Sequence, residues 1–206
     1  MELNEKGLPF FPELKFEENR HIYMLDGQIL PSVTTVMRPL DNALYQGIDE
    51  EIMKMAAHRG TAVHNAVENY VLYGIEDIEP KYAGYFEGFL KFWNEQNPEP
   101  LATESRLYHK ILRYAGTADL PCVIGGKRIL IDYKTSTAVN RMLTGVQLEA
   151  YARAYDSHGF KFDGKAIVHL KNDGSYQMVQ YKANDMESWE VFSSLMVVWN
   201  HIQKYK

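Results

Sequence analysis

The spacing of apolar residues differs between the two halves of the chain. Residues 14–30 alternate between apolar and polar positions around the turn dipeptide Asp26-Gly27, which predicts a β-hairpin. From 49 to 73 the apolar residues recur every three or four positions, which predicts helix, with a break between two helices at Arg59-Gly60. Two further helices are expected, a short one from the cap Ser32 to Pro39 and another from Pro80 to Asn97.

The second half reads as strands interrupted by helices. Three strands are predicted over 101–107, 113–123 and 128–133, and Gly125-Gly126 joins the last two. The order of elements predicts an α/β fold, with a central mixed sheet from about 101 to 181 flanked by helices and preceded by a helical N-terminal part. The remaining elements are a helix over 141–157, a hairpin of 166–170 and 176–181 around Asn172-Asp173-Gly174, and a final helix from the cap Asn184 to about Tyr205.

Length and composition restrict the class of protein. With 206 residues, 46% of them hydrophobic, we expect a single domain over 1–206: a hairpin and helical part in 1–100, and a sheet core with helices in 101–206. The sequence contains neither an apolar run of membrane-spanning length nor an N-terminal signal segment, so we expect a cytoplasmic protein of a bacterium or a phage-infected host that does not bind membranes. The single cysteine, Cys122, excludes an intramolecular disulfide and a four-thiolate zinc or iron–sulfur site.

Charge is distributed unevenly along the chain. The net charge of −5 argues against a protein that coats nucleic acid through bulk positive charge. Residues 41–100 contain 11 acids and 4 bases, whereas residues 127–165 contain 7 bases and 4 acids. We therefore expect any polyanion to bind near the second stretch.

The predicted strand over 128–133 leads into the most informative group of residues. Because side chains alternate along a strand, Asp132 and Lys134 should project from the same face. Asp119 lies on the preceding predicted strand, within reach across the glycine turn. Two neighbouring carboxylates can share a hard cation, and a lysine beside them can orient or deprotonate a water and stabilise negative charge on a phosphate. A lone Asp-x-Lys is usually a solvated surface pair, and the second acid favours a site instead.

Four motifs in order carry a resemblance to a known family. They are Gly60-Thr61-Ala62-Val63-His64, Gly116-x-x-Asp119, Asp132-Tyr133-Lys134 and Gln147-Leu148-Glu149-Ala150-Tyr151. Together they resemble the PD-(D/E)XK nuclease superfamily, with its restriction-endonuclease-like sheet. Within it the chain is similar to the RecB-like branch, which includes mitochondrial genome maintenance exonucleases and phage and bacterial single-strand DNA exonucleases. The resemblance extends from Pro31-Ser32-Val33-Thr34 to the final strand pair and helix.

The resemblance implies a role for individual residues. Lys134, Asp119 and Asp132 are the implied catalytic residues, acting with one or two Mg²⁺ or Mn²⁺ ions. The implied metal ligands are His64, Asp119, Asp132, the backbone carbonyl of Tyr133 and, as a further candidate, Glu104. The alternative for His64 is a hydrogen-bonded or exposed helix residue, and the alternative for Glu104 is a surface acid.

Substrate contacts are expected around the same motifs. Gln147 and Tyr151 share one helix face, and the resemblance makes them contacts of the substrate, while the alternative is that Tyr151 packs on the sheet. The aromatic residues between Pro80 and Asn97 have the spacing of a helix core and stay outside the site. Candidate contacts to the nucleic-acid backbone are Arg59, Lys110, Arg113, Thr135, Ser136, Arg141 and Arg153, although each alone is more typical of a solvated side chain.

These motifs imply a divalent-metal-dependent DNA exonuclease that prefers single-stranded ends. One alternative is a structure-specific or flap endonuclease of the same superfamily. Another is a catalytically idle nucleic-acid-binding module, although such a module should have lost an acid or the lysine, and Asp119, Asp132 and Lys134 are all in place. The sequence contains no Gly-x-Ser-x-Gly elbow and no phosphate-binding Gly-x-x-x-x-Gly-Lys loop.

Overall fold

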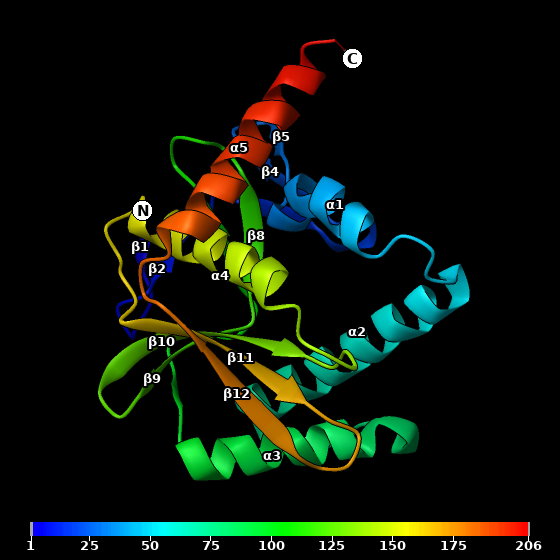
Figure 1. The fold of residues 1–206 in the computed structure, drawn as a ribbon. Coiled ribbons are helices and arrows are strands. Elements are labelled where there is room, and N and C mark those ends of the chain that lie inside the picture. The colour runs from blue at the N-terminus through cyan, green and yellow to red at the C-terminus, as the bar shows by residue number, and fades with distance from the viewer. Residues whose placement is uncertain (1, 206) are drawn as a thin grey trace.

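A five-stranded sheet forms the middle layer of the molecule, and helices cover both of its faces (Figure 1). The computed structural model describes residues 2–205. The strands lie in the order β12-β11-β10-β9-β6. Their bounds are Glu99–Pro100 for β6, Leu120–Ile124 for β9, Lys127–Lys134 for β10, Gly164–Leu170 for β11 and Tyr176–Tyr181 for β12.

The sheet is mixed because β10 and β11 run parallel while the other neighbours run antiparallel. Parallel strands need a crossover connection, and helix α4 (Arg141–Asp156) lies between them in the chain. The register places Asp132 opposite Ile167 and Lys134 opposite His169. The prediction of an α/β fold with a central mixed sheet flanked by helices is confirmed.

Side chains of β10 alternate between two apolar layers, as the period of a strand requires. Ile131 and Tyr133 pack with residues of α2 (Glu50–Tyr73) and α3 (Ala83–Gln96). Leu130 belongs to the other layer, which includes residues of α4 and α5 (Met186–Gln203). In Figure 1, α3 lies below the sheet, and α4 and α5 lie above it. Asp132 has the orientation of Leu130 and therefore projects toward α4.

The helix that follows Ser32 is longer than predicted. Helix α1 spans Val33–Leu44, and the side chain of Ser32 accepts a hydrogen bond from the N–H of Thr35, as expected of a cap. The prediction that Pro39 ends this helix is wrong. Proline inside a helix removes one backbone hydrogen bond, but Val33, Val36 and Met37 are buried in the core, and this packing stabilises the helix through the proline.

The predicted break at Arg59-Gly60 is also wrong, because α2 continues from Glu50 to Tyr73. Asp49 caps the helix through its carboxylate, and Gly74, at φ 68°, ends it. Glycine inside a helix costs about 1 kcal/mol relative to alanine. That cost is too small to interrupt a helix of 24 residues whose second half is anchored in the core through Val63 and Val67.

Two of the predicted strands are each divided. The residues of 101–107 belong partly to an irregular segment after β6 and partly to β7 (Ser105–Tyr108). The prediction over 113–123 contains two strands, β8 (Ala115–Ala118) and β9. Strands β7 and β8 pair with each other, outside the five-stranded sheet. A chain that moves from one sheet to another keeps its apolar alternation, so the pattern does not reveal the change of partner.

The N-terminal hairpin is confirmed and contains an additional strand. The turn Asp26-Gly27 joins β4 and β5, with φ of 53° and 75° at its two residues, and β3 pairs along the other edge of β4. Strands β1 and β2 precede these three strands in the chain and form a separate two-stranded sheet. The bounds are Glu2–Leu3 for β1, Pro9–Phe10 for β2, Lys15–Glu17 for β3, Ile22–Leu25 for β4 and Gln28–Leu30 for β5.

The predicted helix from Pro80 and the hairpin near Asn172 are both present, the first as a short 3₁₀ turn followed by α3, the second as β11 and β12. The cap of α5 is Asp185 rather than the predicted Asn184, whose side chain accepts a hydrogen bond of 2.5 Å from Arg153. Within residues 2–205, no helix combines the length and the apolar character needed to cross a membrane.

Candidate metal centre

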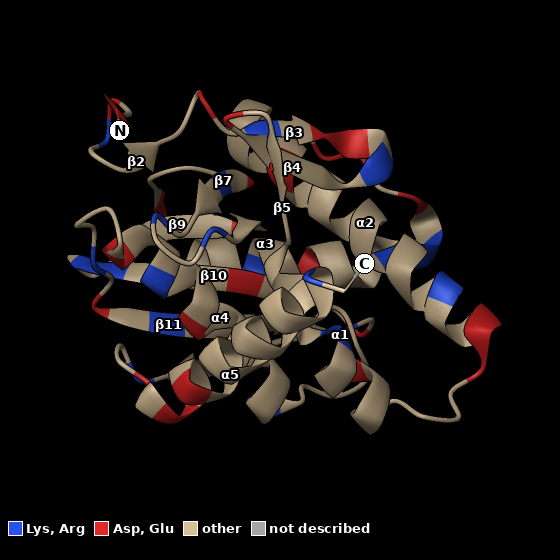
Figure 2. Cartoon of the chain, turned by 90° about the horizontal axis from the view of Figure 1, so that it is seen from above, with Lys and Arg blue, Asp and Glu red and all other residues tan. Residues whose placement is uncertain are grey.

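The C-terminal end of β10 carries the two charged residues that the sequence places on one face. The Nζ atom of Lys134 lies 2.6 Å from Oδ2 of Asp132. Asp132 is buried, with a side chain only 3% exposed, whereas 27% of the Lys134 side chain is accessible. Figure 2 shows acidic and basic positions next to each other along β10. The ion pair therefore opens to solvent on the side of the ammonium.

Asp119 lies where the chain passes from β8 to β9, and not within a continuous strand as predicted. Its Oδ2 atom accepts a hydrogen bond of 2.7 Å from the backbone N–H of Tyr133, the middle residue of the Asp132-Tyr133-Lys134 motif. Its carbonyl accepts a hydrogen bond of 2.9 Å from the N–H of Glu104. The break in the strand thus attaches Asp119 to β10 on one side and to the segment before β7 on the other.

His64 projects from α2 into this arrangement. Its Nδ1 atom lies 3.5 Å from Oε1 of Glu104 and 3.6 Å from Oδ2 of Asp119, and its Nε2 atom lies 3.3 Å from the carbonyl oxygen of Tyr133. One ligand atom from each of His64, Glu104 and Asp119 falls within 4.8 Å of the others. Three segments far apart in the sequence therefore converge on one point beside the end of β10.

Glu104 reaches this point from an unusual backbone conformation. Its φ of 44° lies in the left-handed region, which residues other than glycine rarely occupy. The residue ends the irregular segment between β6 and β7 and directly precedes the first residue of β7. Such conformations cost free energy and tend to persist at functional sites, where the surroundings hold them in place.

The charges in the cluster shift one another's pKa values. Burial lowers the pKa of His64, but the carboxylates of Asp119 and Glu104 outweigh this effect and raise it to about 9. Burial and the neighbouring Asp132 raise the pKa of Asp119 to about 7, against the opposite effect of His64. Burial also lowers the pKa of Lys134, yet the carboxylates of Asp132 and Asp119 raise it overall. Positive charge is strongly favoured at this point of the molecule.

The donor set fits a hard divalent cation. Carboxylate and carbonyl oxygens with one imidazole nitrogen suit Mg²⁺ or Mn²⁺, whereas thiolate ligands are absent from the cluster. Oδ2 of Asp132 is buried and, among the described residues, meets no hydrogen-bond donor with good geometry, although the Lys134 ammonium is close. A buried carboxylate oxygen with a free lone pair is what a further cation would satisfy.

Gln147 and Tyr151 on α4 line the other side of Asp132. Nε2 of Gln147 donates to Oδ1 of Asp132 and to the hydroxyl oxygen of Tyr151, each at 3.2 Å. The ring of Tyr151 packs on β8, where a Cβ atom added to Gly116 would lie 2.6 Å from it. The Gly116-x-x-Asp119 spacing therefore has a packing reason, since only glycine leaves room for this ring.

The C-terminal end of β10 is surrounded by three of the predicted substrate contacts, Arg59, Thr135 and Ser136. Nε of Arg59 donates to Oγ1 of Thr135 at 3.4 Å, and the guanidinium lies 5.5 Å from the centre of the Tyr85 ring. The carbonyl of Ser136 is 2.6 Å from Nε2 of His169, which fixes the turn after β10. These contacts bring one cation and two hydroxyl-bearing residues next to the lysine.

The other predicted backbone contacts are directed elsewhere. Arg141 donates to the carbonyl of Gln180 at 3.2 Å and lies over the Tyr181 ring. Arg113 pairs with Asp26 in the N-terminal hairpin, and Arg153 pairs with Glu149. The N–H of Lys110 donates to Ser157. None of these four residues has a described contact with the acids of the candidate metal centre.

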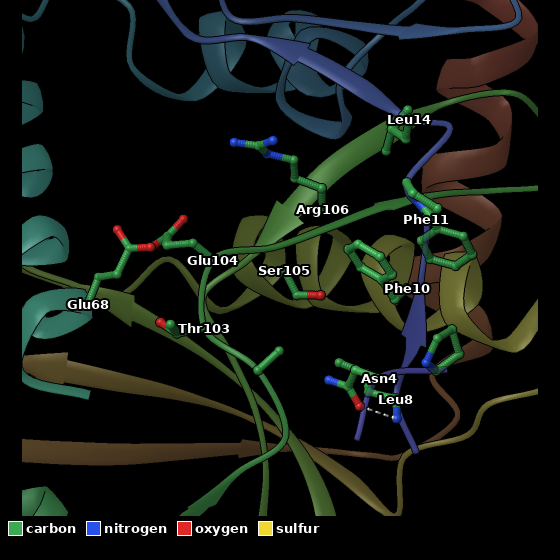
Figure 3. Close-up of a pocket in the computed structure, with 13 residues that line it drawn as sticks. Asn4, Leu8, Phe10, Phe11, Leu14, Glu68, Thr103, Glu104, Ser105 and Arg106 are labelled. Atoms are coloured by element: carbon green, nitrogen blue, oxygen red, sulfur yellow. Dashed lines mark hydrogen bonds between the residues drawn. The ribbon is translucent and has the colours of Figure 1, made fainter. Parts of the chain in front are cut away.

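Sequence reasoning missed three charged residues near the centre. Glu68 lies one turn after His64 on α2, and Figure 3 shows its carboxylate pointing toward Glu104. Arg106 lies two positions after Glu104, and these two residues line one hollow together with Glu68. Asp41 of α1 lines a hollow of about 240 Å³ that also contains Lys134 and Gln147. The i, i+4 and i, i+2 spacings could have indicated Glu68 and Arg106, whereas only the fold brings Asp41 close.

No family model matches the chain, and no curated protein matches it. The protein SSO0001 aligns with 85% of this chain and 78% of its own, at 15% identity and a TM-score of 0.46. The alkaline exonuclease LHK-Exo from Laribacter hongkongensis aligns with 69% of this chain and 80% of its own, at 13% identity and a TM-score of 0.41. The structure of LHK-Exo in complex with dAMP aligns with 85% of this chain and 88% of its own, at 12% identity and a TM-score of 0.41. Values this low establish neither the family nor the RecB-like branch, which stays a prediction.

Proposed function

We propose that this protein is a divalent-metal-dependent nuclease that hydrolyses phosphodiester bonds of DNA, with a preference for single-stranded ends. The observation that carries the proposal is the convergence of His64, Glu104 and Asp119 within 4.8 Å, directly beside the Asp132–Lys134 pair. Residues from α2, the β6–β7 segment, the β8–β9 junction and β10 meet there. Bringing together this many acids has a cost that a bound cation would remove.

The proposed ligands are His64, Glu104, Asp119, Asp132 and the carbonyl of Tyr133. A bound Mg²⁺ or Mn²⁺ would supply charge neutralisation for the phosphate and make water a better nucleophile. The N–H of Tyr133 and the side chain of Gln147 hold Asp119 and Asp132 in place through hydrogen bonds of 2.7 and 3.2 Å. The acids are therefore oriented before any substrate binds.

Lys134 supplies the positive charge that the reaction needs at the phosphate. The neighbouring carboxylates raise its pKa against the effect of burial, so it is an ammonium at neutral pH. An ammonium with 27% of its side chain accessible can donate to a phosphate oxygen or hold the attacking water, and it stabilises the negative charge that develops in the transition state. Arg59, beside Thr135, provides a second cation close by for the nucleic-acid backbone.

The proposed preference for single strands is supported by the charge of the protein. Binding of duplex DNA relies on neutralising many phosphates, and a chain with a net charge of −5 has few cations to spare for that purpose. Single strands can be bound by stacking of bases together with a few phosphate contacts. The resemblance of the sequence motifs to single-strand exonucleases points the same way.

The direct test is degradation of end-labelled oligonucleotides in single-stranded, double-stranded and circular form, with Mg²⁺ or with a chelator. We expect metal-dependent release of nucleotides from linear single strands, loss of activity in Asp132→Asn, and intact circles. The matched control is Asp26→Asn, which removes a carboxylate from an exposed ion pair with Arg113. It should retain full activity.

The remaining outcomes separate the alternatives. Cleavage of circles or removal of flaps would indicate an endonuclease of the same chemistry. Binding of oligonucleotides without any degradation, by a protein that also binds Mg²⁺, would contradict the proposed activity and support an idle binding module.

A further inference from the structure

Two neighbouring hollows beside the candidate metal centre share three of their lining residues, and we treat them together as one groove. The first has a volume of about 600 Å³ and lies between the N-terminal segment and β7 (Figure 3). The second, of about 690 Å³, contains His64. Both are lined by Glu68, Glu104 and Arg106, so the N-terminal groove, as we call the two together, starts at the candidate metal ligands. Each volume falls in the range of sites that hold small ligands or parts of polymers.

Arg106 is the cation of this groove. Its guanidinium lies 5.0 Å from the centre of the Phe16 ring and forms no ion pair within 4.0 Å with any described residue. Figure 3 shows its side chain extending from β7, apart from the facing carboxylates of Glu68 and Glu104. An exposed guanidinium offers several donors in a fixed plane, which matches the geometry of a phosphate. Its position two residues after Glu104 ties it to the metal centre.

Phe10 supplies an aromatic surface farther along the same groove. The residue is 51% exposed, and its ring makes no described contact with another aromatic ring. Pairing of β1 with β2 fixes its backbone. Single exposed apolar residues are common on protein surfaces. This one differs because it lines a hollow that leads to a candidate metal centre and contains an unpaired arginine.

The second hollow is also lined by Gly60, a glycine in the interior of α2. A Cβ atom added there would meet no atom within 4 Å beyond its chain neighbours and the backbone of its own helix turn, so packing within the described residues does not require glycine. Alanine would favour the helix more. Gly60 lines the groove together with His64 and Arg106.

From these observations we infer that the N-terminal groove binds an unpaired nucleotide adjoining the bond that is cleaved, with its phosphate on Arg106 and its base stacked on Phe10. This inference rests on the proposed nuclease function. The acids Glu68 and Glu104 limit electrostatic attraction in the groove, so stacking has to contribute to affinity. A base inside a duplex has both faces covered by its neighbours and cannot stack on a side chain. The groove therefore selects single strands.

Binding is measured in a Lys134→Ala background with Mg²⁺, using a labelled short oligothymidylate and a series of the same strand in which one position at a time lacks its base. Arg106→Ala should weaken binding about tenfold and lower the slope of log Kd against log salt by about 0.7, the value for one phosphate contact on a single strand. Phe10→Ala should also weaken binding about tenfold. At one position of the series, the missing base should weaken binding to the Lys134→Ala parent but should not weaken binding to the variant that also carries Phe10→Ala.

Two matched variants control for indirect effects. Arg20→Ala removes an exposed arginine that pairs with Glu17 outside the groove, and Leu3→Ala removes an exposed apolar side chain from β1 beside Phe10. Both should bind as the parent does, and unfolding curves should show that all variants are folded.

The inference would be overturned by an unchanged affinity and salt slope in Arg106→Ala, or by a missing base that costs the same in the parent and in Phe10→Ala. Failure of the proposed function has a different signature. In that case calorimetry would detect no Mg²⁺ binding, or the wild-type protein would leave the strand intact, whatever the groove variants do.

Discussion

Two groups of buried charges lie at opposite ends of the parallel pair β10 and β11, and they are built differently. At the N-terminal end of β11, the carboxylate of Glu149 contacts the Lys165 ammonium and the Arg153 guanidinium, and it also accepts from the N–H of Asp185. The side chains of Glu149 and Lys165 are 1% and 0% exposed. Every charge of this first group, which we call the structural cluster, has a partner of opposite sign.

The candidate metal centre has an excess of acids instead. Glu104, Asp119 and Asp132 share one histidine and one lysine, and Oδ2 of Asp132 has no well-oriented donor among the described residues. Burial, together with the charge of Asp132, raises the pKa of Asp119 to about 7, which means that both the buried position and the neighbouring acid oppose its ionisation. The charges of the structural cluster are satisfied within the protein, whereas the acids of the candidate metal centre offer oxygen ligands that a cation could occupy.

The largest expected effect comes from the metal centre. Asp132→Asn should reduce nuclease activity by about a thousandfold or more, since it removes a proposed ligand and the partner of Lys134. The same substitution should lower the free energy of unfolding of the metal-free protein much less than Glu149→Gln does, because the lost pair with the partly exposed Lys134 is offset by the removal of a charge that repels Asp119. Single-turnover assays and urea unfolding on the same preparation measure both quantities. A large loss of stability would mean that Asp132 belongs to a structural ion pair like Glu149.

The opposite behaviour is expected in the structural cluster. Glu149→Gln should lower the free energy of unfolding by about 3–5 kcal/mol, because Lys165 would stay buried without a carboxylate. The activity of the protein that remains folded should be unchanged. Urea unfolding and activity per folded molecule check this pair of results. The double variant Glu149→Leu, Lys165→Met should recover part of the stability, and a failure to recover would show that the contribution of the cluster is not an unpaired-charge effect.

Stabilisation by a bound cation should further distinguish the candidate metal centre from the structural cluster. Mg²⁺ at about 100 times its Kd should stabilise the wild-type protein by about 2.7 kcal/mol through mass action. The gain should vanish in Asp119→Asn and persist in Glu149→Gln. Thermal unfolding with and without Mg²⁺ measures it, with Ca²⁺ as a second hard cation. An equal gain in Asp119→Asn would place the cation elsewhere.

The smallest effect concerns His109, which stacks on Trp189 next to Arg153. Burial, with His158 and Arg153, lowers the pKa of His109 to about 4. Its Nδ1 atom accepts from the N–H groups of Ile111 and Leu112, which requires the unprotonated ring. Because the pKa is lower in the folded state than in the unfolded chain, the contribution is complete above pH 6.5 and is lost as the pH falls toward 4.

We expect a loss on the order of 1–3 kcal/mol over that range. The variant His109→Gln, compared with wild type by unfolding at pH 7 and pH 4.5, isolates this contribution. An equal pH dependence in both proteins would contradict the interpretation.

The sequence indicated which residues converge at the candidate metal centre, but it did not indicate the structural cluster. Asp119, Asp132, Lys134 and His64 stand out because their spacing forms recognisable motifs, and the period of a strand orients Asp132 and Lys134 correctly. Glu149 and Lys165 give no such signal, since their contact depends on how α4 packs over β11. The sequence motif containing Glu149 suggests a place near the candidate metal centre, because Gln147, two residues earlier, faces Asp132, whereas Glu149 itself contacts Lys165.

The fold was predicted where local signals dominate and misjudged where packing decides. Glycine turns and helix caps fixed the hairpins and most helix starts. Pro39 does not end α1 and Gly60 does not divide α2, because core contacts stabilise both helices through these residues. The divided strands around Glu104 and Asp119 were missed because both parts keep the alternation of a single strand. These breaks are the positions that bring the two acids to His64.

The most direct test is the position of a bound cation. Crystals soaked in Mn²⁺ should show an anomalous scattering peak within ligand distance of His64, Glu104 and Asp119, and the peak should be absent from crystals of Asp119→Asn. A peak at another place, or none at all in crystals whose protein degrades DNA, would contradict the metal centre described above.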